Sequence, residues 1–305
     1  ELSREGKEGA EELTTILNRY LATLIDSIVA YGGDILLFGG DALMAVFDGE
    51  GHALRAARCG LEIQEHVSES GRVETSQGAF DIGLHVGISS GELLLARVGG
   101  RDRRHLLIRG ELLESLCAAE EASGAGDVVV SDQTVRLLGE DASVSPCPEL
   151  ATLHRLTGLS QRAGSWRASD AGSELFIDDD VLRALVPYLP HQIRNRIGTG
   201  SLDEGEHRPV VILFAGYRDV DALGDDHTRD TLFETIDSCV EGFGGTLVRD
   251  DFTASGPRFL VLFGAPQALE DAAFEAVQCA LNLHERIPDS FQLRAAVSYG
   301  QVFAG

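Results

Sequence analysis

The chain has 305 residues and carries 25 Lys and Arg against 49 Asp and Glu, a formal net charge of −24 at pH 7. This acidic balance argues against nucleic acid or an anionic membrane surface as a partner, because phosphates are bound by clustered Lys and Arg. No apolar run approaches the roughly 18 residues that span a bilayer, and the first residues, "ELSREGKE", are charged rather than signal-like. We therefore expect a cytoplasmic protein without membrane insertion.

The length of the chain suits two domains better than one small core. Its cysteines are scattered, odd in number and without a CxxC pair, which is typical of reduced thiols rather than of disulfides or a zinc site. They are Cys59, Cys117, Cys147, Cys239 and Cys279. Neither a P-loop nor a dinucleotide-binding glycine pattern occurs.

The first hundred residues predict a helix, a β-hairpin, a second helix and a strand–turn–strand unit. Their ranges are 10–30, 35–47, 52–67 and 84–99. Apolar residues at helical spacing form one stripe along the first helix, and Gly32 ends it. In the hairpin, "ILLF" turns through Gly39-Gly40-Asp41 into "ALMAVF", and the glycines permit a positive φ at the turn.

The same series of elements recurs in the second half of the chain. "VEGFGGTLVRD" (240–250) echoes "IVAYGGDILLF" (28–38), and "FLVLFGAP" (259–266) echoes "LMAVFDGE" (43–50). The second helix and the strand–turn–strand unit recur as "EAVQCALNLHERI" (275–287) and "LRAAVSYGQVFAG" (293–305). Because the four blocks keep their order and nearly their spacing, we infer two copies of one α/β domain.

The two copies differ at their ends. The second begins with an apolar strand at 208–217 that has no counterpart before the first helix, whereas the first continues through a strand, a helix and a strand over 105–131. We therefore expect a first domain at 1–134 without its N-terminal strand and a second at 208–305 without its C-terminal part. Residues 135–207 are expected to be a linker with one short helix, and further domains are expected in the parent chain.

Asp41 places a carboxylate at the tip of the first hairpin, directly after two glycines that allow close approach of a ligand to the backbone. Mg²⁺ is commonly held by one or two carboxylates together with substrate phosphates. The alternative is ordinary turn chemistry, since Asp stabilises turns through its own side chain. The corresponding hairpin of the second copy reads "RDDFTASGPR", so the two tips have diverged chemically.

Taken together, "GGDILLFGGDALMAVF", "AARCGLEIQ" and "LHVGISSGELLLARVG" resemble the first catalytic domain of class III nucleotidyl cyclases. "RPVVILFAG", "VLFGAP" and "CALNLHERI" are similar to the start of their second domain, and the likeness is greatest to tandem-domain soluble, bicarbonate-responsive adenylyl cyclases. The resemblance implies α/β (α+β, ferredoxin-like) domains that form a pseudo-heterodimer with the active site between them.

The resemblance also implies a lyase of intracellular signalling that converts ATP to cyclic AMP and pyrophosphate with two Mg²⁺ or Mn²⁺ ions. Asp41 falls on the second metal-binding aspartate of the family, with Gly39 and Gly40 beside the nucleotide; the first aspartate would precede Glu1. Arg249 aligns with the purine-recognising lysine. The residues that stabilise the transition state would lie beyond Gly305, so no catalytic residue is assigned.

In the soluble cyclases a lysine and an arginine bind bicarbonate at a second, degenerate site, and the resemblance places Leu37 and Cys117 at these positions. Neither side chain pairs with an anion, so we expect little or no bicarbonate response unless Arg104 or Arg109 substitutes. Two alternatives to the adenylyl cyclase stay open: a catalytically silent nucleotide-sensing or regulatory module, and a guanylyl cyclase. The "GGDAL" hairpin is also similar to that of diguanylate cyclases, against which the tandem unequal copies argue.

Overall fold

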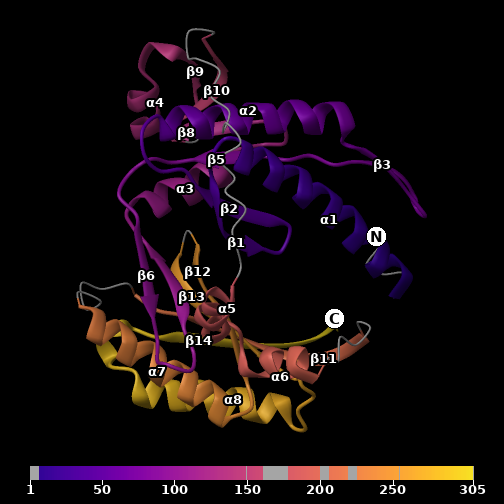
Figure 1. Ribbon diagram of the computed structural model, residues 1–305, viewed down its shortest axis with the longest axis vertical. Helices are drawn as coiled ribbons and strands as arrows, with labels where there is room; N and C mark the ends of the chain where they lie inside the picture. Colours follow the sequence, from indigo (N-terminus) through magenta and orange to yellow (C-terminus); the bar gives the residue numbers. More distant parts are fainter. Residues whose placement is uncertain are drawn as a thin grey trace. The chain divides into compact units, whose positions relative to one another are not determined.

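The computed structural model describes residues 7–148, 150–160, 178–199, 206–218, 225–253 and 255–304 (Figure 1). The chain divides into two compact units, each of which is described by itself. The first unit is formed by Glu1–Glu92 and Glu111–Leu175, and the second by Leu93–Gly110 and Phe176–Gly305. Both combine helices and strands, which confirms the expected α+β class. Within the described ranges, no helix is long and apolar enough to cross a membrane.

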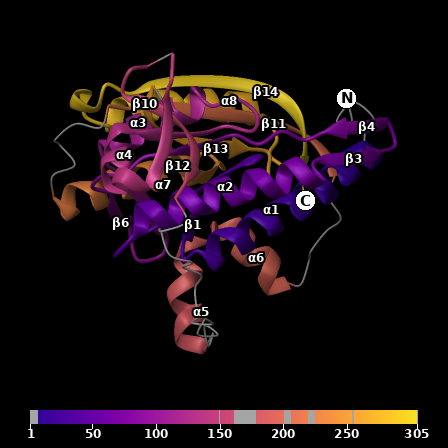
Figure 2. The same cartoon turned by 90° about the horizontal axis from the view of Figure 1, so that it is seen from above.

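The first unit packs two long helices against short sheets. Its elements are α1 (Lys7–Ala30), β1 (Asp34–Gly39), β2 (Ala42–Val46), α2 (His52–Ser70), β3 (Arg72–Thr75), β4 (Gly78–Asp81), β5 (Val86–Ile88), α3 (Leu112–Glu121), β8 (Val128–Ser131), α4 (Asp132–Leu138), β9 (Ala142–Pro146) and β10 (Leu153–Leu159). α1 and α2 run alongside each other (Figure 2) and bury Leu24, Ile28 and Ile63 between them and the β1–β2 hairpin. A second sheet, in the order β5-β8-β10-β9, packs through Val128 and Val130 on α2.

The second unit is built on one four-stranded sheet in the order β12-β13-β11-β14. Its elements are β6 (Leu94–Val98), β7 (His105–Arg109), α5 (Asp179–Leu185), α6 (His191–Thr199), β11 (Glu206–Gly216), α7 (Asp226–Gly242), β12 (Thr246–Thr253), β13 (Gly256–Phe263), α8 (Ala272–Arg286) and β14 (Arg294–Ala304). α7 and α8 lie side by side on one face of the sheet (Figure 1). Along β13, half-buried and buried residues alternate from Gly256 to Phe263, as in a strand with one face on a helical layer.

The internal repeat is visible where a helix leads into a strand, from α1 into β1 and from α7 into β12. Gly32 and Gly244 both take a positive φ, of 68° and 71°, and end α1 and α7. The next glycine is packed tightly in each copy, because a Cβ atom on Gly33 would lie 2.7 Å from the Phe47 ring and one on Gly245 2.8 Å from the Phe263 ring. The two Gly-Gly pairs therefore serve the same purpose: the first residue turns the chain and the second lets an aromatic ring touch the backbone.

The copies differ in the strand–turn–strand block, and here the expectation was wrong for the second copy. The first copy has two separate strands, β5 and β6, whereas residues 294–304 form the single strand β14. β14 pairs with β11 from Gly216↔Arg294 to Glu206↔Ala304, and this continuous ladder keeps it a single strand. β5 has no such partner, since the described part of the first unit contains no strand equivalent to β11.

The boundaries of the two units differ from the domain boundaries expected from the sequence, which were 1–134, 135–207 and 208–305. Residues 142–159 of the expected linker form β9 and β10, which extend the sheet of the first unit through β8. The β6–β7 hairpin at 94–109 belongs to the second unit. The described part of the expected linker contains two helices, α5 and α6, where one was expected, while residues 161–177 and 200–205 lie outside the described residues.

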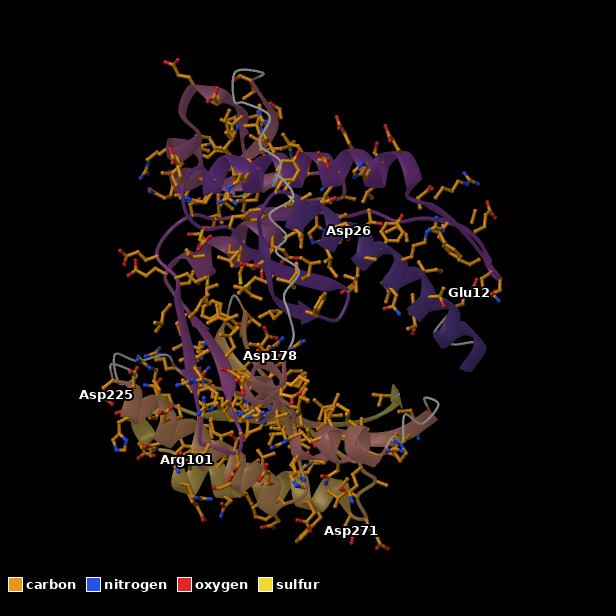
Figure 3. The ribbon with its side chains drawn as sticks, in the orientation of Figure 1. Glu12, Asp26, Arg101, Asp178, Asp225 and Asp271 are labelled. Carbon is orange, nitrogen blue, oxygen red and sulfur yellow. The ribbon has the colours of Figure 1, made fainter. Side chains whose placement is uncertain are left out.

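Part of the acidic excess lies at helix starts. Asp178 precedes α5 and accepts hydrogen bonds from the backbone N–H groups of Asp180 and Val181, at 3.0 and 2.9 Å. Asp225 precedes α7 and accepts from the Thr228 N–H at 2.7 Å, which holds the pKa of its carboxyl below the usual value. Both residues are exposed and are labelled in Figure 3. These carboxylates satisfy otherwise unpaired helix N–H groups.

We expect Gly245→Ala to destabilise the second unit by about 1–3 kcal/mol, because the added methyl group would overlap Phe263 and Val240. The matched control is Gly242→Ala in the last turn of α7, where a Cβ atom meets nothing within 4 Å. That substitution should be neutral or slightly stabilising, since Ala favours helix over Gly. Urea unfolding measures both; equal effects at the two positions would contradict the close-packing explanation.

Candidate functional site

The β1–β2 hairpin presents Asp41 at its tip, as the sequence predicted. Pairing runs from Asp34↔Val46 to Gly39↔Ala42, with an irregularity between Ile35 and Leu37. Gly40 takes φ of +79° in the turn, a conformation that L side chains rarely adopt, and Asp41 follows it as an exposed residue. The hairpin base packs on α1 and α2, so a supported scaffold holds the carboxylate in solvent.

A carboxylate oxygen is a suitable ligand for Mg²⁺ or Mn²⁺. Within the described ranges, however, no cluster of three or more His, Cys, Asp or Glu side chains is arranged to hold a metal ion. The donor chemistry of Asp41 therefore fits one ligand position of such an ion, and the described side chains do not complete the site. The ion binding implied by the resemblance stays a prediction.

Leu37 and Cys117, the positions of the degenerate site, lie on different elements of the first unit. Leu37 is half-buried in β1 and pairs with Met44 of β2. Cys117 is half-buried in α3 and is not part of a disulfide. Neither side chain carries a positive charge, so the expectation of a weak bicarbonate response stands as a prediction.

Arg249 lies in the second unit, on β12, beside an irregularity between Leu247 and Arg249. Its Nη2 is 3.3 Å from Asp251 Oδ2, and the same oxygen lies 3.5 Å from Arg258 Nη2. The guanidinium of Arg258 lies 4.8 Å from the centroid of the Phe214 ring, a distance typical of cation–π contacts. The two guanidinium groups thus share one carboxylate oxygen of Asp251.

Asp250 lies between Arg249 and Asp251 on β12, and its side chain points to the opposite face of the strand. There it forms a buried polar network that the sequence did not indicate. Its carboxylate is 2.8 Å from Arg109 Nη1, and the two side chains are 1% and 7% exposed. Tyr217 donates its hydroxyl proton to Asp250 Oδ1 at 2.6 Å, while Arg109 donates to the Tyr217 hydroxyl and to the Ile108 carbonyl. Burial raises the pKa of Asp250, and Arg109 and Tyr217 oppose that shift.

The β6–β7 hairpin is anchored in the second unit by further buried contacts. His105 Nε2 lies 3.0 and 2.9 Å from the two carboxylate oxygens of Asp237 on α7. The backbone N–H of Gly99 donates to Asp230 Oδ1 at 3.0 Å. Leu107 and Phe233, both fully buried, pack together between these polar anchors. Arg109, which the sequence left as a substitute anion ligand, is therefore engaged with Asp250 in this hairpin.

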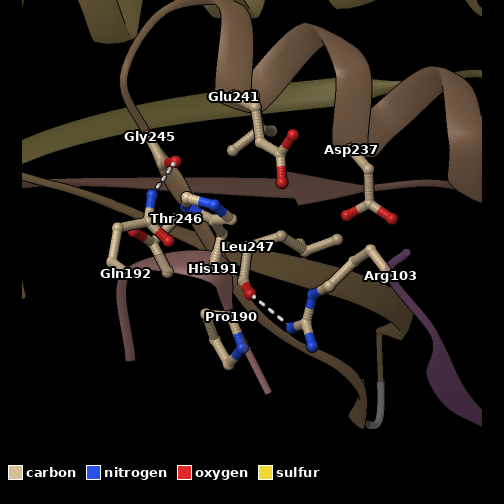
Figure 4. A pocket seen from close by; sticks show the side chains of 10 residues that line it. Arg103, Pro190, His191, Gln192, Asp237, Glu241, Gly245, Thr246 and Leu247 are labelled. Atoms are coloured by element: carbon tan, nitrogen blue, oxygen red, sulfur yellow. Dashed lines mark hydrogen bonds between the residues drawn. The ribbon is translucent and has the colours of Figure 1, made fainter. Parts of the chain in front are cut away.

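A small pocket lies where α6, α7 and β12 meet (Figure 4). Arg103 reaches into it and donates from Nη2 to the Leu247 carbonyl at 3.2 Å, while Gln192 donates to the Gly245 carbonyl at 3.3 Å. Asp237 and Glu241 line the same pocket. Arg103 thus satisfies backbone carbonyls at a junction of elements, which is a structural role.

No protein-family model matches the chain. It is similar to adenylate cyclase type 10 of Oryctolagus cuniculus, with 32% identity over 97% of this chain and 20% of that protein. It is also similar to adenylate cyclase type 10 of Mus musculus, with 30% identity over 97% of this chain and 20% of that protein. The chain thus spans 20% of the length of these curated relatives. Among solved structures, the adenylyl cyclase CyaB from P. aeruginosa is 22% identical with a TM-score of 0.44, covering 50% of this chain and 86% of that chain.

The buried network yields a stability prediction. Arg109→Met should lower the free energy of unfolding by about 3–5 kcal/mol, because it leaves the buried Asp250 carboxylate without its counter-charge. The double variant Arg109→Met/Asp250→Asn should lose less than the sum of the two single variants. Arg258→Met is the control, since its pair with Asp251 is longer and 38% exposed on the arginine side, and it should cost under about 1 kcal/mol. Additive losses in chemical denaturation would disprove the coupling.

Proposed function

Because this chain is a homologue of the adenylate cyclase type 10 proteins and, with them, of class III nucleotidyl cyclases, we propose that it is an adenylyl cyclase region of a larger protein. In this proposal it converts ATP to cyclic AMP and pyrophosphate. The observation that carries it is Asp41, an exposed carboxylate at the tip of a glycine-rich hairpin that rests on two helices. The homology extends over both copies of the repeat, which favours a tandem cyclase over a single-domain binding module.

The proposed site uses the two equivalent hairpins of the repeat for different purposes. The β1–β2 tip receives the phosphates, since a Cβ atom on Gly40 would meet nothing within 4 Å and the turn leaves room for a ligand. Asp41 supplies an oxygen ligand to Mg²⁺ or Mn²⁺; such an ion, when bound, offsets negative charge on the phosphates. We propose that the two units pair as a pseudo-heterodimer and so bring Asp41 and Arg249 to one nucleotide.

Arg249 is proposed to recognise the purine. A guanidinium donates hydrogen bonds from a rigid, planar fork and cannot accept any, so it matches acceptor atoms at the edge of a base. Asp251, 3.3 Å away, restricts its orientation. Donation alone does not distinguish adenine from guanine, and the choice of ATP over GTP therefore rests on the likeness to adenylate cyclases.

The reaction is an in-line displacement in which the ribose 3′-oxygen forms a bond to the α-phosphorus and the bond to the pyrophosphate oxygen breaks. Positioning of the triphosphate and offsetting of its charge account for most of the catalysis in such reactions. In this chain the residues proposed for that positioning are Asp41, Gly39 and Gly40. The groups that stabilise the transition state are not assigned.

Asp41→Asn should reduce cyclic AMP formation by about 100-fold or more, because an amide is a poorer metal ligand than a carboxylate. The control is Asp34→Asn, an exposed aspartate at the other end of β1 that should leave activity near the wild-type value. The assay uses the parent protein with Mn²⁺ and measures cyclic AMP from ATP and cyclic GMP from GTP. Product from GTP alone would identify a guanylyl cyclase, and ATP binding without any product would identify a silent nucleotide-sensing module.

Arg249→Ala should raise the KM for ATP by about tenfold, the effect of losing one charged hydrogen bond to the substrate. Arg258→Ala is the matched variant, because both arginines pair with the same oxygen of Asp251. If Arg249 contacts the base, only its variant changes the ratio of ATP to GTP turnover. The same change in both variants would indicate a general electrostatic effect of this face.

A further inference from the structure

The thiols of Cys239 and Cys279 touch in the layer of helices that covers the second unit's sheet. Cys239 lies on α7 and Cys279 on α8, and their Sγ atoms are 3.9 Å apart. The residues are 2% and 0% exposed. Cys239 Sγ also lies 3.3 Å from Asn282 Oδ1, which orients the thiol along α8. We propose that Cys239 and Cys279 form a reversible dithiol–disulfide pair that a hydroperoxide oxidises.

The distance between the sulfurs suits this chemistry. A disulfide requires an S–S separation of about 2.05 Å, so the two atoms must approach by roughly 2 Å. Each cysteine has a small side chain with a single χ1 bond, so rotation about χ1 changes the position of its sulfur. The chain between them runs through β12 and β13, and a cross-link would therefore join two helices that are separated by a complete hairpin.

Cys239 is suited to be the attacking thiol. Its hydrogen bond with Cys279 lowers the pKa of Cys239, and the guanidinium of Arg286 adds to this effect, while burial opposes it. By contrast, burial raises the pKa of Cys59, the repeat counterpart of Cys279, to about 12. The thiolate is the nucleophile in thiol oxidation. Arg286 is exposed and Asn282 half-buried, so two of the side chains that interact with Cys239 lie at or near the surface of the helical layer.

The oxidation proceeds in two balanced steps. The Cys239 thiolate attacks one peroxide oxygen, so that an S–O bond forms, the O–O bond breaks and hydroxide leaves; the sulfur is oxidised by two electrons and the peroxide is reduced. The Cys279 thiol then attacks the sulfenic sulfur, the S–S bond forms, the S–O bond breaks and water leaves with the thiol proton. External dithiothreitol reverses the product to two thiols.

The disulfide would act on the helix that holds the β6–β7 hairpin. α7 carries Asp230, Phe233 and Asp237, which contact Gly99, Leu107 and His105. A covalent bond from α7 to α8 limits the movements of this helix and also restrains the unfolded chain. We therefore expect the oxidised protein to melt at a higher temperature than the reduced protein.

The test treats the native protein with hydrogen peroxide, blocks the remaining thiols and maps peptides by mass spectrometry. The expected result is a Cys239–Cys279 linked peptide about 2 Da lighter than its two reduced parts, lost on treatment with dithiothreitol. Cys279→Ser should abolish the link and leave a sulfenic acid at Cys239 that dimedone traps. Cys59→Ser should leave the link unchanged, since Cys59 lies in the first unit.

Peptide mapping of the chain without substitutions tests the proposal even if a serine variant folds poorly, because it looks for the Cys239–Cys279 link directly. Oxidation of Cys117, the half-buried cysteine, without any Cys239–Cys279 link would overturn the proposal. So would a link that forms only after the protein is unfolded in urea, because the native geometry would then play no part in it.

Discussion

The ion pair between Arg109 and Asp250 removes two charges from water almost completely, and its environment has to compensate for their lost hydration. Taking both ions out of water costs several kcal/mol each, which the attraction between them offsets only when further hydrogen bonds complete the site. The Tyr217 hydroxyl and the Ile108 carbonyl supply those bonds. The pair joins β7 to β12, and through it a hairpin from the sequence of the first copy becomes part of the second unit.

The other contacts of the hairpin follow from this placement. With β7 beside β12, His105 meets Asp237 and Leu107 meets Phe233 along α7. On one face of β7, His105 and Arg109 pair with carboxylates, and Leu107 between them packs on Phe233. The apolar contacts stabilise the hairpin but do not depend on exact geometry. The ion pairs form only when β7 has one particular register.

Duplication with chemical divergence has left one scaffold with two chemically different hairpins. Both copies keep the Gly-Gly corner, in which a positive φ turns the chain and an aromatic ring touches the next glycine. The hairpins that follow differ: β1–β2 ends in a single exposed carboxylate, while β12–β13 carries two arginines around one aspartate. An acidic tip suits a metal ion and a guanidinium suits a base or a phosphate, so the proposed cyclase divides its ligand contacts between the copies.

The sequence by itself determined the elements that depend on local interactions. Helical periodicity and the internal repeat predicted α1, α2 and α8, and the turn chemistry of Gly39-Gly40-Asp41 predicted a carboxylate at a hairpin tip. Only the tertiary structure decided how distant segments pair. β14 is one strand because β11 accompanies it along its length, residues 142–159 join a sheet rather than a linker, and Asp250 is buried against Arg109 of β7. In each case the deciding partner lies far along the chain, where neither periodicity nor turn propensity carries information about it.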